Sequence, residues 1–238
     1  MDLIKQIINT KVTEFPWPYK VIDNFFEENI FQILTNFSKS SLSKFGVEKN
    51  QSIDPVTLVK LKSIIDPILF EEIFKVNSDL LKNTNNIANT FLHSRKYNSY
   101  YSMPSFHFLK PNAGFHPIHD EVIDKTISIV VYLYPEESVG TRLYKNCSNQ
   151  SFECEVKWKP NRALIFCGNE NITWHDFGTD HRPRVTLNFF LKKNLLKDFI
   201  ETDEEFIFLD SENKEIRVSK DYENIEIKKL YDKKLITC

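Results

Sequence analysis

The chain has 238 residues, of which 41% are hydrophobic and 13% aromatic, enough to bury one sizeable core. Its formal net charge is −2, so no overall charge draws it to nucleic acid, and we expect no nucleic-acid partner. No apolar run is long enough to span a bilayer and the N-terminus lacks a signal-peptide layout, so we expect a cytoplasmic protein without membrane association. Heavy use of Asn, Lys, Ile and Phe, with only 5 Gly, suggests a microbial or viral source.

Residues 1–96 are predicted to be mainly helical support for the rest of the chain. One early strand is expected at about 19–25. Apolar residues then recur at helical spacing from Glu27 to Phe45 and again from Asp66 to Leu92. Each of these two stretches is therefore predicted to be a helix with one buried face.

From about residue 97 to 192 the pattern changes to short apolar strands. Turn signals stand between them at 111–114, 135–137 and 168–171. Short strands at this spacing favour an all-β sandwich or barrel, most simply a jelly roll with the N-terminal helices packed on one sheet. The fold class is thus α+β, mainly β with flanking helices.

The tail, 195–238, is predicted to be an extension of that core. It begins with a short helix and continues with Phe206 to Leu209 and Glu215 to Val218 around a polar turn, the pattern of a hairpin. No internal repeat, low-complexity segment or linker interrupts the sequence, so 1–238 is predicted to form a single domain.

Three residues within the β region have the spacing of a metal site. His119 and Glu121 are two positions apart, and a strand places such residues on one face, with Asp120 turned the other way. A second imidazole, His175, follows after enough chain for several strands to fold back beside the first pair. Two His and one carboxylate, with the other positions open, form the facial triad of non-haem Fe(II) oxygenases.

A carboxylate-binding residue follows the second histidine. Arg184 begins a stretch in which Arg184, Thr186 and Asn188 alternate with apolar residues, the pattern of a half-buried strand. A turn separates it from His175, so the two side chains can occupy neighbouring strands. A guanidinium binds a carboxylate through two charge-assisted hydrogen bonds. Arg182 is the competing choice, but it lies in the turn, immediately before Pro183, and ranks second.

Together these residues resemble the 2-oxoglutarate- and Fe(II)-dependent oxygenases, in particular the prolyl-4-hydroxylase-like branch. The resemblance covers most of the chain and implies a double-stranded β-helix (jelly roll, cupin-like) core. Its segments occur in the expected order at 16–26, 119–125, 126–133, 140–144, 159–166, His175 and 184–186. One position departs from the pattern, since the family usually has His-x-Asp and this chain has Glu121. A carboxylate is still present there, which argues against a halogenase-like variant.

The resemblance also implies roles and cofactors. His119, Glu121 and His175 would bind Fe(II), while Arg184 and Thr186 would hold the far carboxylate of 2-oxoglutarate. The implied reaction uses O₂, hydroxylates a C–H bond and releases succinate and CO₂, with ascorbate as an optional cofactor. Tyr132 is a further candidate for contact with cosubstrate or substrate, against the alternative of a packed strand tyrosine. The substrate, peptidyl-proline or a small molecule, is not specified by these motifs.

Two alternatives remain open. The first is a catalytically silent jelly-roll binding module, and the second is a cupin-type metal enzyme that does not use O₂. The other histidines are expected to have structural roles. His107 could line the pocket, but a place in the core or at the rim is favoured. His116, beside Pro117, is expected to shape the approach to the strand. His93 and His181 have no partner in the sequence that indicates chemistry.

Overall fold

The computed structural model describes residues 2–45, 54–57, 61, 64–91, 101–102, 104–109, 111, 118–121, 125–148, 151–168, 172–178, 180–192, 200–201, 205–209 and 215–219. Its helices are α1 (Leu3–Asn9), α2 (Glu28–Phe45), α3 (Pro67–Lys82) and α4 (Thr84–Asn89). Its strands are β1 (Tyr19–Ile22), β2 (Asp54–Thr57), β3 (Tyr101–Ser102), β4 (Ser105–Leu109), β5 (Lys125–Tyr134), β6 (Thr141–Leu143), β7 (Cys154–Val156), β8 (Ala163–Cys167), β9 (His175–Phe177), β10 (Arg184–Lys192), β11 (Ile200–Glu201), β12 (Glu205–Leu209) and β13 (Glu215–Ser219).

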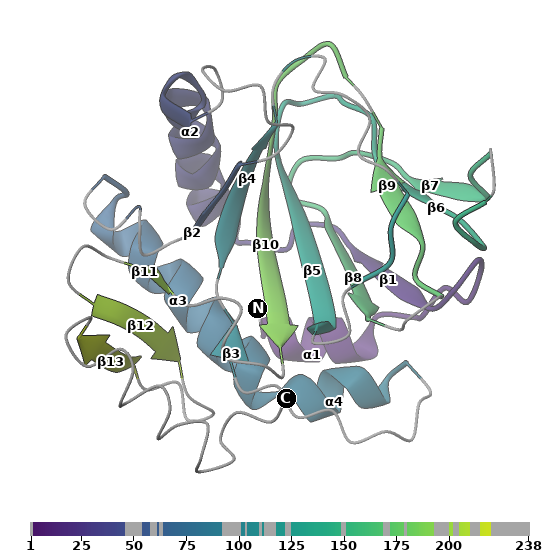
Figure 1. Ribbon diagram of the computed structural model, residues 1–238, viewed down its shortest axis with the longest axis horizontal. Coiled ribbons are helices and arrows are strands. Elements are labelled where there is room, and N and C mark those ends of the chain that lie inside the picture. The colour runs from purple at the N-terminus through teal and green to yellow at the C-terminus, as the bar shows by residue number, and fades with distance from the viewer. Residues whose placement is uncertain are drawn as a thin grey trace.

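A large antiparallel sheet forms the centre of the molecule (Figure 1). Its strand order is β1-β8-β5-β10-β4-β2, and β3 also pairs with β10. A smaller sheet, β7-β6-β9, lies beside it, and β11, β12 and β13 form a third sheet in the tail. Because β10 and β5 come from distant parts of the sequence and pair along most of their length, the centre of the sheet depends on long-range contacts.

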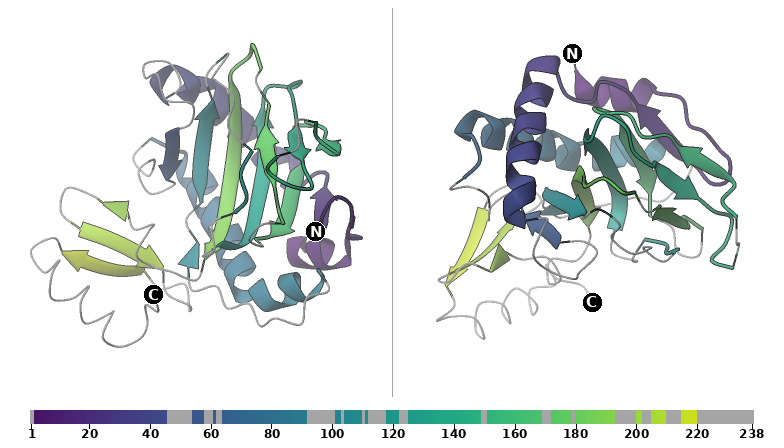
Figure 2. Two further views of the ribbon diagram at one scale, coloured as in Figure 1. Left: turned by 45° about the vertical axis from the view of Figure 1, so that its right-hand side comes forward. Right: turned by 90° about the horizontal axis from the view of Figure 1, so that it is seen from above.

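The two faces of the large sheet pack against different partners. Apolar side chains on one face, including Val131 and Leu187, share a core with Leu34 of α2, Ile73 of α3 and Ile87 of α4. The helices lie on the side of this sheet turned away from β6, β7 and β9 (Figure 2). On the other face a second apolar cluster lies between the large and small sheets, formed by Trp17, Tyr19, Tyr132, Leu143, Val156, Leu164 and Phe166.

Most predicted elements are present. The early strand is confirmed but ends at Ile22, before Asn24, which adopts a positive φ of 54°. The helix predicted at 27–45 and the tail hairpin are confirmed. The turn signal at 135–137 follows directly after β5. The predicted short helix at 195 lies outside the described residues, as do most of the turn at 111–114 and the last three positions of the turn at 168–171.

The single helix predicted from Asp66 to Leu92 is wrong, because α3 ends at Lys82 and α4 begins at Thr84. The Asn83 side chain donates to the Asp79 carbonyl at 2.9 Å, and Thr84 Oγ1 donates to the Leu81 carbonyl at 2.8 Å. Asn and Thr side chains that bond to the backbone offer it an alternative to the helical ladder. The apolar spacing continues through this break, so periodicity alone predicted one helix.

The strand that begins at Arg184 is not half-buried as predicted. Its apolar face packs on the helices, but Arg184, Thr186 and Asn188 on its polar face are also buried, with 4%, 8% and 5% exposure. Polar side chains on this face therefore line an internal space and not the protein surface. Strand β2, which no pattern predicted, extends the same sheet beyond β4.

None of the helices in the described ranges is long and apolar enough to cross a membrane.

Candidate functional site

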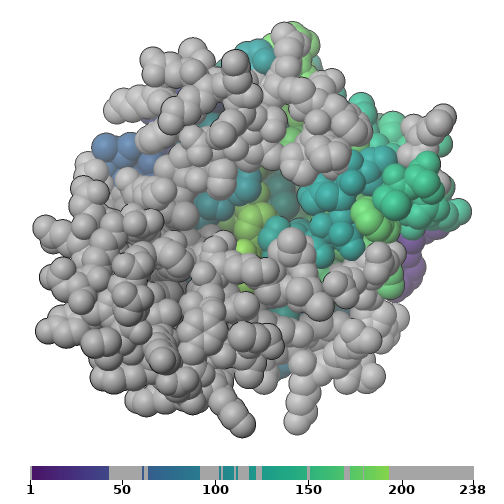
Figure 3. All heavy atoms as spheres, in the orientation of Figure 1, coloured from purple at the N-terminus to yellow at the C-terminus, as the bar shows by residue number. Residues whose placement is uncertain are grey.

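A cavity of about 200 Å³ lies between the large sheet and the small sheet. In the space-filling view of Figure 3, this face of the molecule is hollowed near its centre, where teal and green atoms of the strands are visible. All six residues that the sequence assigned to the site line this cavity: His119, Glu121, Tyr132, His175, Arg184 and Thr186. Asp120 is not among the described residues that line it.

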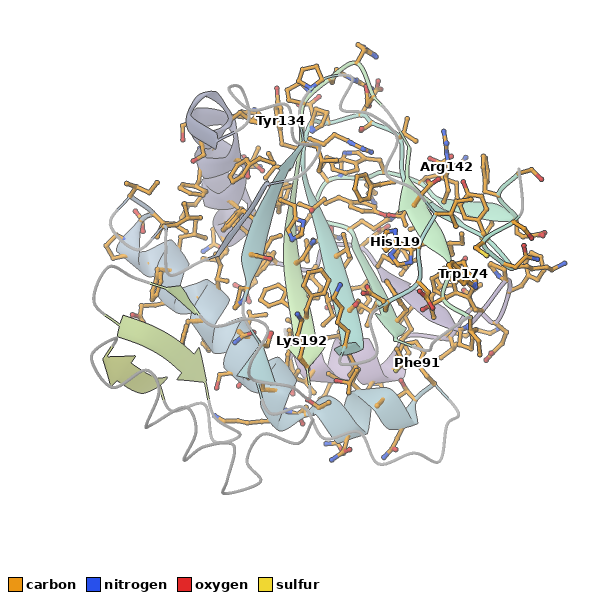
Figure 4. All side chains as sticks on the ribbon, in the orientation of Figure 1. Phe91, His119, Tyr134, Arg142, Trp174 and Lys192 are labelled. Carbon is orange, nitrogen blue, oxygen red and sulfur yellow. The ribbon has the colours of Figure 1, made fainter. Side chains whose placement is uncertain are left out.

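The two histidines are joined through their backbones. His119 and His175 exchange two main-chain hydrogen bonds, of 3.1 and 2.8 Å, and their ring centroids lie 4.4 Å apart. Figure 4 shows His119 beside β9, the strand that begins with His175. The predicted strand at 119–121 is reduced to this one bridge, so the pairing partner, and not a regular strand, places His119.

The His175 ring has a defined tautomer. Its Nδ1 lies 2.7 Å from the Thr173 carbonyl oxygen, which can only accept, so Nδ1 carries the proton. In its neutral form the ring therefore has a lone pair on Nε2, the form in which imidazole binds metals. Phe166 and Trp17 pack against the ring at centroid distances of 5.1 and 6.4 Å and fix its orientation.

Glu121 is a buried carboxylate with 4% exposure. Its Oε1 accepts from Ser128 Oγ at 2.6 Å, and its Oε2 lies 2.6 Å from Lys125 Nζ. Burial alone would raise the pKa of Glu121, but the Lys125 charge, His175 and the Ser128 hydrogen bond together hold that pKa below its usual value. The carboxylate is therefore ionised at neutral pH.

The three candidate ligands share one cavity but do not meet at one point. Over the described stretches of the chain, no three His, Cys, Asp or Glu side chains have the mutual geometry of a metal site. The Glu121 carboxylate contacts Lys125 and Ser128, on β5, while the imidazoles of His119 and His175 adjoin each other at β9.

Arg184 lies at another part of the cavity and is almost fully buried. Its Nη1 donates to the Val139 carbonyl at 2.9 Å and its Nη2 to the Gly178 carbonyl at 2.6 Å. The guanidinium also lies 5.5 Å from the centroid of the Phe177 ring. Burial lowers the pKa of Arg184, and the nearby Asp180 carboxylate opposes that shift. A guanidinium has five N–H donors, so the two carbonyls leave donors for a ligand.

Tyr132 and Thr186 face the cavity from neighbouring strands. They lie opposite each other where β5 pairs with β10, and His107 of β4 lies opposite Thr186 on its other side. The Tyr132 hydroxyl is 2.7 Å from Thr141 Oγ1, and its ring stacks on Trp158 with centroids 4.6 Å apart. Burial raises the pKa of Tyr132 to about 12, so its hydroxyl stays protonated and can donate.

The competing arginine is held elsewhere. Arg182 bonds to Asp180 through its backbone N–H at 3.0 Å and its side chain at 3.4 Å. It is not among the described residues that line the cavity. His107 lines the cavity, the less favoured of the two places that the sequence left open for it. The His181 side chain is 78% exposed, and His93 and His116 lie outside the described residues.

Among the cavity residues that the sequence did not assign to the site are Lys125, Asn188 and Phe190. Asn188 and Phe190 continue the period-2 row from Arg184 and Thr186, so extending that row would have found both. Lys125 follows Glu121 by four positions, but an acidic and a basic residue at that spacing are common on exposed surfaces.

No protein-family model matches the chain, and no curated protein matches it either. Solved structures do. A prolyl-4-hydroxylase from Pseudomonas putida is 13% identical, with a TM-score of 0.51 over 80% of this chain and 97% of that one. A prolyl hydroxylase from Trichoplax adhaerens, in complex with a peptide fragment of the hypoxia inducible factor oxygen degradation domain, is 14% identical, with a TM-score of 0.55 over 80% of this chain and 89% of that one. The resemblance read from the sequence is thereby confirmed at the level of fold: this chain folds as prolyl hydroxylases of the 2-oxoglutarate- and Fe(II)-dependent oxygenases do.

Proposed function

We propose that this protein is an Fe(II)- and 2-oxoglutarate-dependent dioxygenase that hydroxylates a C–H bond and releases succinate and CO₂. One observation carries the proposal: a single cavity holds two adjacent imidazoles, an ionised carboxylate and a buried guanidinium, in a fold shared with prolyl hydroxylases. The two antiparallel sheets on either side of this cavity are, in the same proposal, the two halves of a double-stranded β-helix.

The donor set suits iron. Two neutral imidazoles and one carboxylate are the ligands of the facial triad, and the tautomer of His175 leaves Nε2 for a metal. The Glu121 carboxylate is buried and ionised, and its present partner at Oε2 is a cation, Lys125. Binding of a metal would replace one positive partner of this carboxylate by another, with Ser128 still bonded to Oε1.

The chain's own residues would place the cosubstrate. Arg184 would bind its far carboxylate with the donors that Val139 and Gly178 leave over, and Tyr132 and Thr186 line the same part of the cavity with hydroxyl groups. Apolar lining residues such as Leu109 and Phe177 would exclude water, which strengthens such charge-assisted bonds. When bound, iron and 2-oxoglutarate supply the oxidising chemistry, and the protein supplies binding and orientation.

The test of this function is spectroscopic. Without oxygen, adding Fe(II) and 2-oxoglutarate together should produce a visible absorption band that neither produces alone, and admitting O₂ should release succinate. A binding module without chemistry would show neither signal. A cupin-type enzyme that does not use O₂ would bind metal without a band that depends on 2-oxoglutarate.

The metal ligands are tested by substitution. His175→Ala should largely abolish binding of Fe(II) or Mn(II) in a calorimetric titration, because it removes an imidazole ligand from the site. Asp120→Ala is the matched control and should retain the metal, since Asp120 is not among the described residues that line the cavity. Unchanged metal affinity in His175→Ala would remove His175 from the site.

The substrate belongs to the same proposal. Both compared structures are named as prolyl hydroxylases, so prolyl residues of a peptide are the first candidate, with small molecules as the second. A screen of both classes, read by succinate formation and by a product heavier by one oxygen atom, separates them.

A further inference from the structure

The charges of the cavity are not balanced by the proposed iron and cosubstrate. The described lining residues include one carboxylate, Glu121, and two basic side chains, Lys125 and Arg184. A dication and the dianion of 2-oxoglutarate cancel each other, so the loaded site keeps one excess positive charge. A charge in a partly buried site attracts a counter-charge more strongly than one in water.

The excess charge lies away from the proposed cosubstrate anchor. Lys125 Nζ is 3.9 Å from the centroid of the Phe190 ring, and the Lys125 side chain is only 18% exposed. Arg184 and Phe190 are six residues apart on the same face of β10, which is roughly 20 Å at about 3.4 Å per residue. Arg184 is the proposed partner of the cosubstrate's far carboxylate, so Lys125 is left for another anion.

A second polar group that lines this cavity also points to a ligand. Asn188 is 5% exposed and lines the cavity, and its Oδ1 has no hydrogen-bond partner within the described part of the chain. A buried acceptor without a donor costs free energy, and native structures contain few of them. Asn188 precedes Phe190 by two residues on the same face of β10, so the two residues are about 7 Å apart along the strand.

We propose that the substrate of this site is a carboxylate-bearing compound with a neighbouring neutral N–H group, such as an N-acylated amino acid. Its carboxylate binds Lys125 Nζ, and its N–H donates to Asn188 Oδ1. A carboxylate matches the single excess charge, whereas a phosphate monoester carries about −1.5 to −2. The apolar stem of Lys125 and the Phe190 ring supply the contact surface between these two polar points. This assignment rests on the proposed function, because the charge count includes the metal and 2-oxoglutarate.

The test measures binding and not turnover. The protein is loaded with Mn(II) and 2-oxoglutarate, and the paramagnetic relaxation of probe protons by the bound Mn(II) reports both affinity and proximity. The probes are N-acetyl-L-alanine and its carboxamide, L-alanine and its carboxamide, and N-acetyl-N-methyl-L-alanine, which has no N–H. We expect N-acetyl-L-alanine to bind about ten-fold more tightly than its amide, a difference of about 1.4 kcal/mol. L-alanine should bind more weakly than N-acetyl-L-alanine, because its ammonium adds a positive charge to the site.

Variants test whether Lys125 recognises the carboxylate of the probe and Asn188 its N–H. Lys125→Met should remove the preference for acid over amide, whereas Lys125→Arg should keep it, because both basic residues carry the charge. Lys145→Met is the matched control, because Lys145 is exposed, pairs with Glu153 and is not among the described residues that line the cavity. Asn188→Leu should weaken binding of the probes that carry an N–H, towards the affinity of N-acetyl-N-methyl-L-alanine. The affinity of N-acetyl-N-methyl-L-alanine itself should not change.

The outcomes separate this assignment from the proposed function. Equal binding of acid and amide to the loaded wild-type protein overturns the assignment and leaves the function intact. An acid preference that survives in folded Lys125→Met also overturns it. Failure of the wild-type protein to bind Mn(II) and 2-oxoglutarate overturns the proposed function, and the assignment with it.

Discussion

The guanidinium of Arg184 is held in place before any ligand arrives. The carbonyls of Val139 and Gly178 each accept from one of its terminal nitrogens, and the strand that carries it is buried on both faces. A side chain that is already ordered loses little further conformational freedom on binding, so more of each new hydrogen bond contributes to affinity. This arrangement makes Arg184 the sharpest residue-level test of the proposed cosubstrate site.

Arg184→Ala should leave Mn(II) binding in place and weaken 2-oxoglutarate strongly. Loss of one partner of a buried charge-assisted pair costs about 2–5 kcal/mol, roughly thirty-fold to several thousand-fold in affinity. Arg184→Lys should recover only part of this, since an ammonium lacks the planar fork. Calorimetry on the Mn(II)-loaded protein gives the affinities. Arg182→Ala is the control, and a large loss in that variant alone would move the anchor to Arg182.

Lys125 and the proposed metal compete for one carboxylate. Lys125 Nζ lies 2.6 Å from Glu121 Oε2, so a dication at Glu121 would lie close to a like charge. Lys125→Met keeps most of the side-chain length and removes that charge. We therefore expect Lys125→Met to bind Mn(II) at least about ten-fold more tightly than the wild type, with Lys145→Met unchanged, in competition against a chelator of known affinity. Weaker binding would instead mean that Lys125 orients Glu121 as a ligand.

At the scale of elements, helix α1 is attached to strand β1 by a buried lysine. Lys20 is fully buried, and its Nζ donates to the carbonyls of Ile7 and Ile8, in the last turn of α1, at 2.8 and 3.2 Å. Burial lowers the pKa of Lys20 to about 8. In the unfolded chain the same group has a pKa of about 10.4.

The free energy of unfolding should therefore depend on pH through Lys20. Between pH 8 and about 10.4 the unfolded chain binds more protons at this group than the folded chain, so its contribution to stability rises with pH. Below pH 8 both states are charged and the contribution is constant. Urea unfolding of the wild type and Lys20→Met at pH 7.5 and 10 should show the wild type gaining up to about 3 kcal/mol relative to the variant. A stability difference between wild type and Lys20→Met that does not change with pH would show that the α1 carbonyls keep Lys20 charged.

Elements with strong local periodicity were predictable, and elements set by competing contacts were not. Helix α2 and the central strands β5 and β10 follow their apolar patterns closely. The break at Asn83 depends on two side-chain hydrogen bonds to the backbone, which periodicity does not register. The place of His119 depends on pairing with His175, far along the chain. The predicted strand at His119 is only an isolated bridge, so a local strand pattern does not explain why His119 lines the cavity.

The candidate site was predictable as a set of residues and only partly as a geometry. Spacing and alternation found six residues that line one cavity. They did not find that Glu121 contacts Lys125, because which partner a buried carboxylate takes is decided by three-dimensional packing. Asn188 was recognised as polar on its strand, but its missing hydrogen-bond partner is a property of the folded cavity alone.

At the scale of the whole molecule, the proposed ligands would join the large sheet to the small sheet. Arg184 belongs to β10 of the large sheet, Glu121 accepts from Ser128 of β5, and His175 belongs to β9 of the small sheet. Figure 1 shows β5 and β10 in one sheet and β9 in the other. A metal and a cosubstrate held by both sheets bind the folded state and not the unfolded chain. Such ligands stabilise a protein by an amount set by their concentration relative to the dissociation constant.

Thermal unfolding should therefore report both ligands separately. At a hundred-fold excess over its dissociation constant, each ligand should add about 2.7 kcal/mol, which raises the Tm of a chain of this size by about 5–11 °C. In Arg184→Ala the increment from Mn(II) should remain, while the increment from 2-oxoglutarate at the same concentration should largely disappear. Chelation of the metal should reverse both increments in the wild type, because 2-oxoglutarate is proposed to bind partly through the metal. A full shift by 2-oxoglutarate without metal would place its binding site elsewhere on the protein.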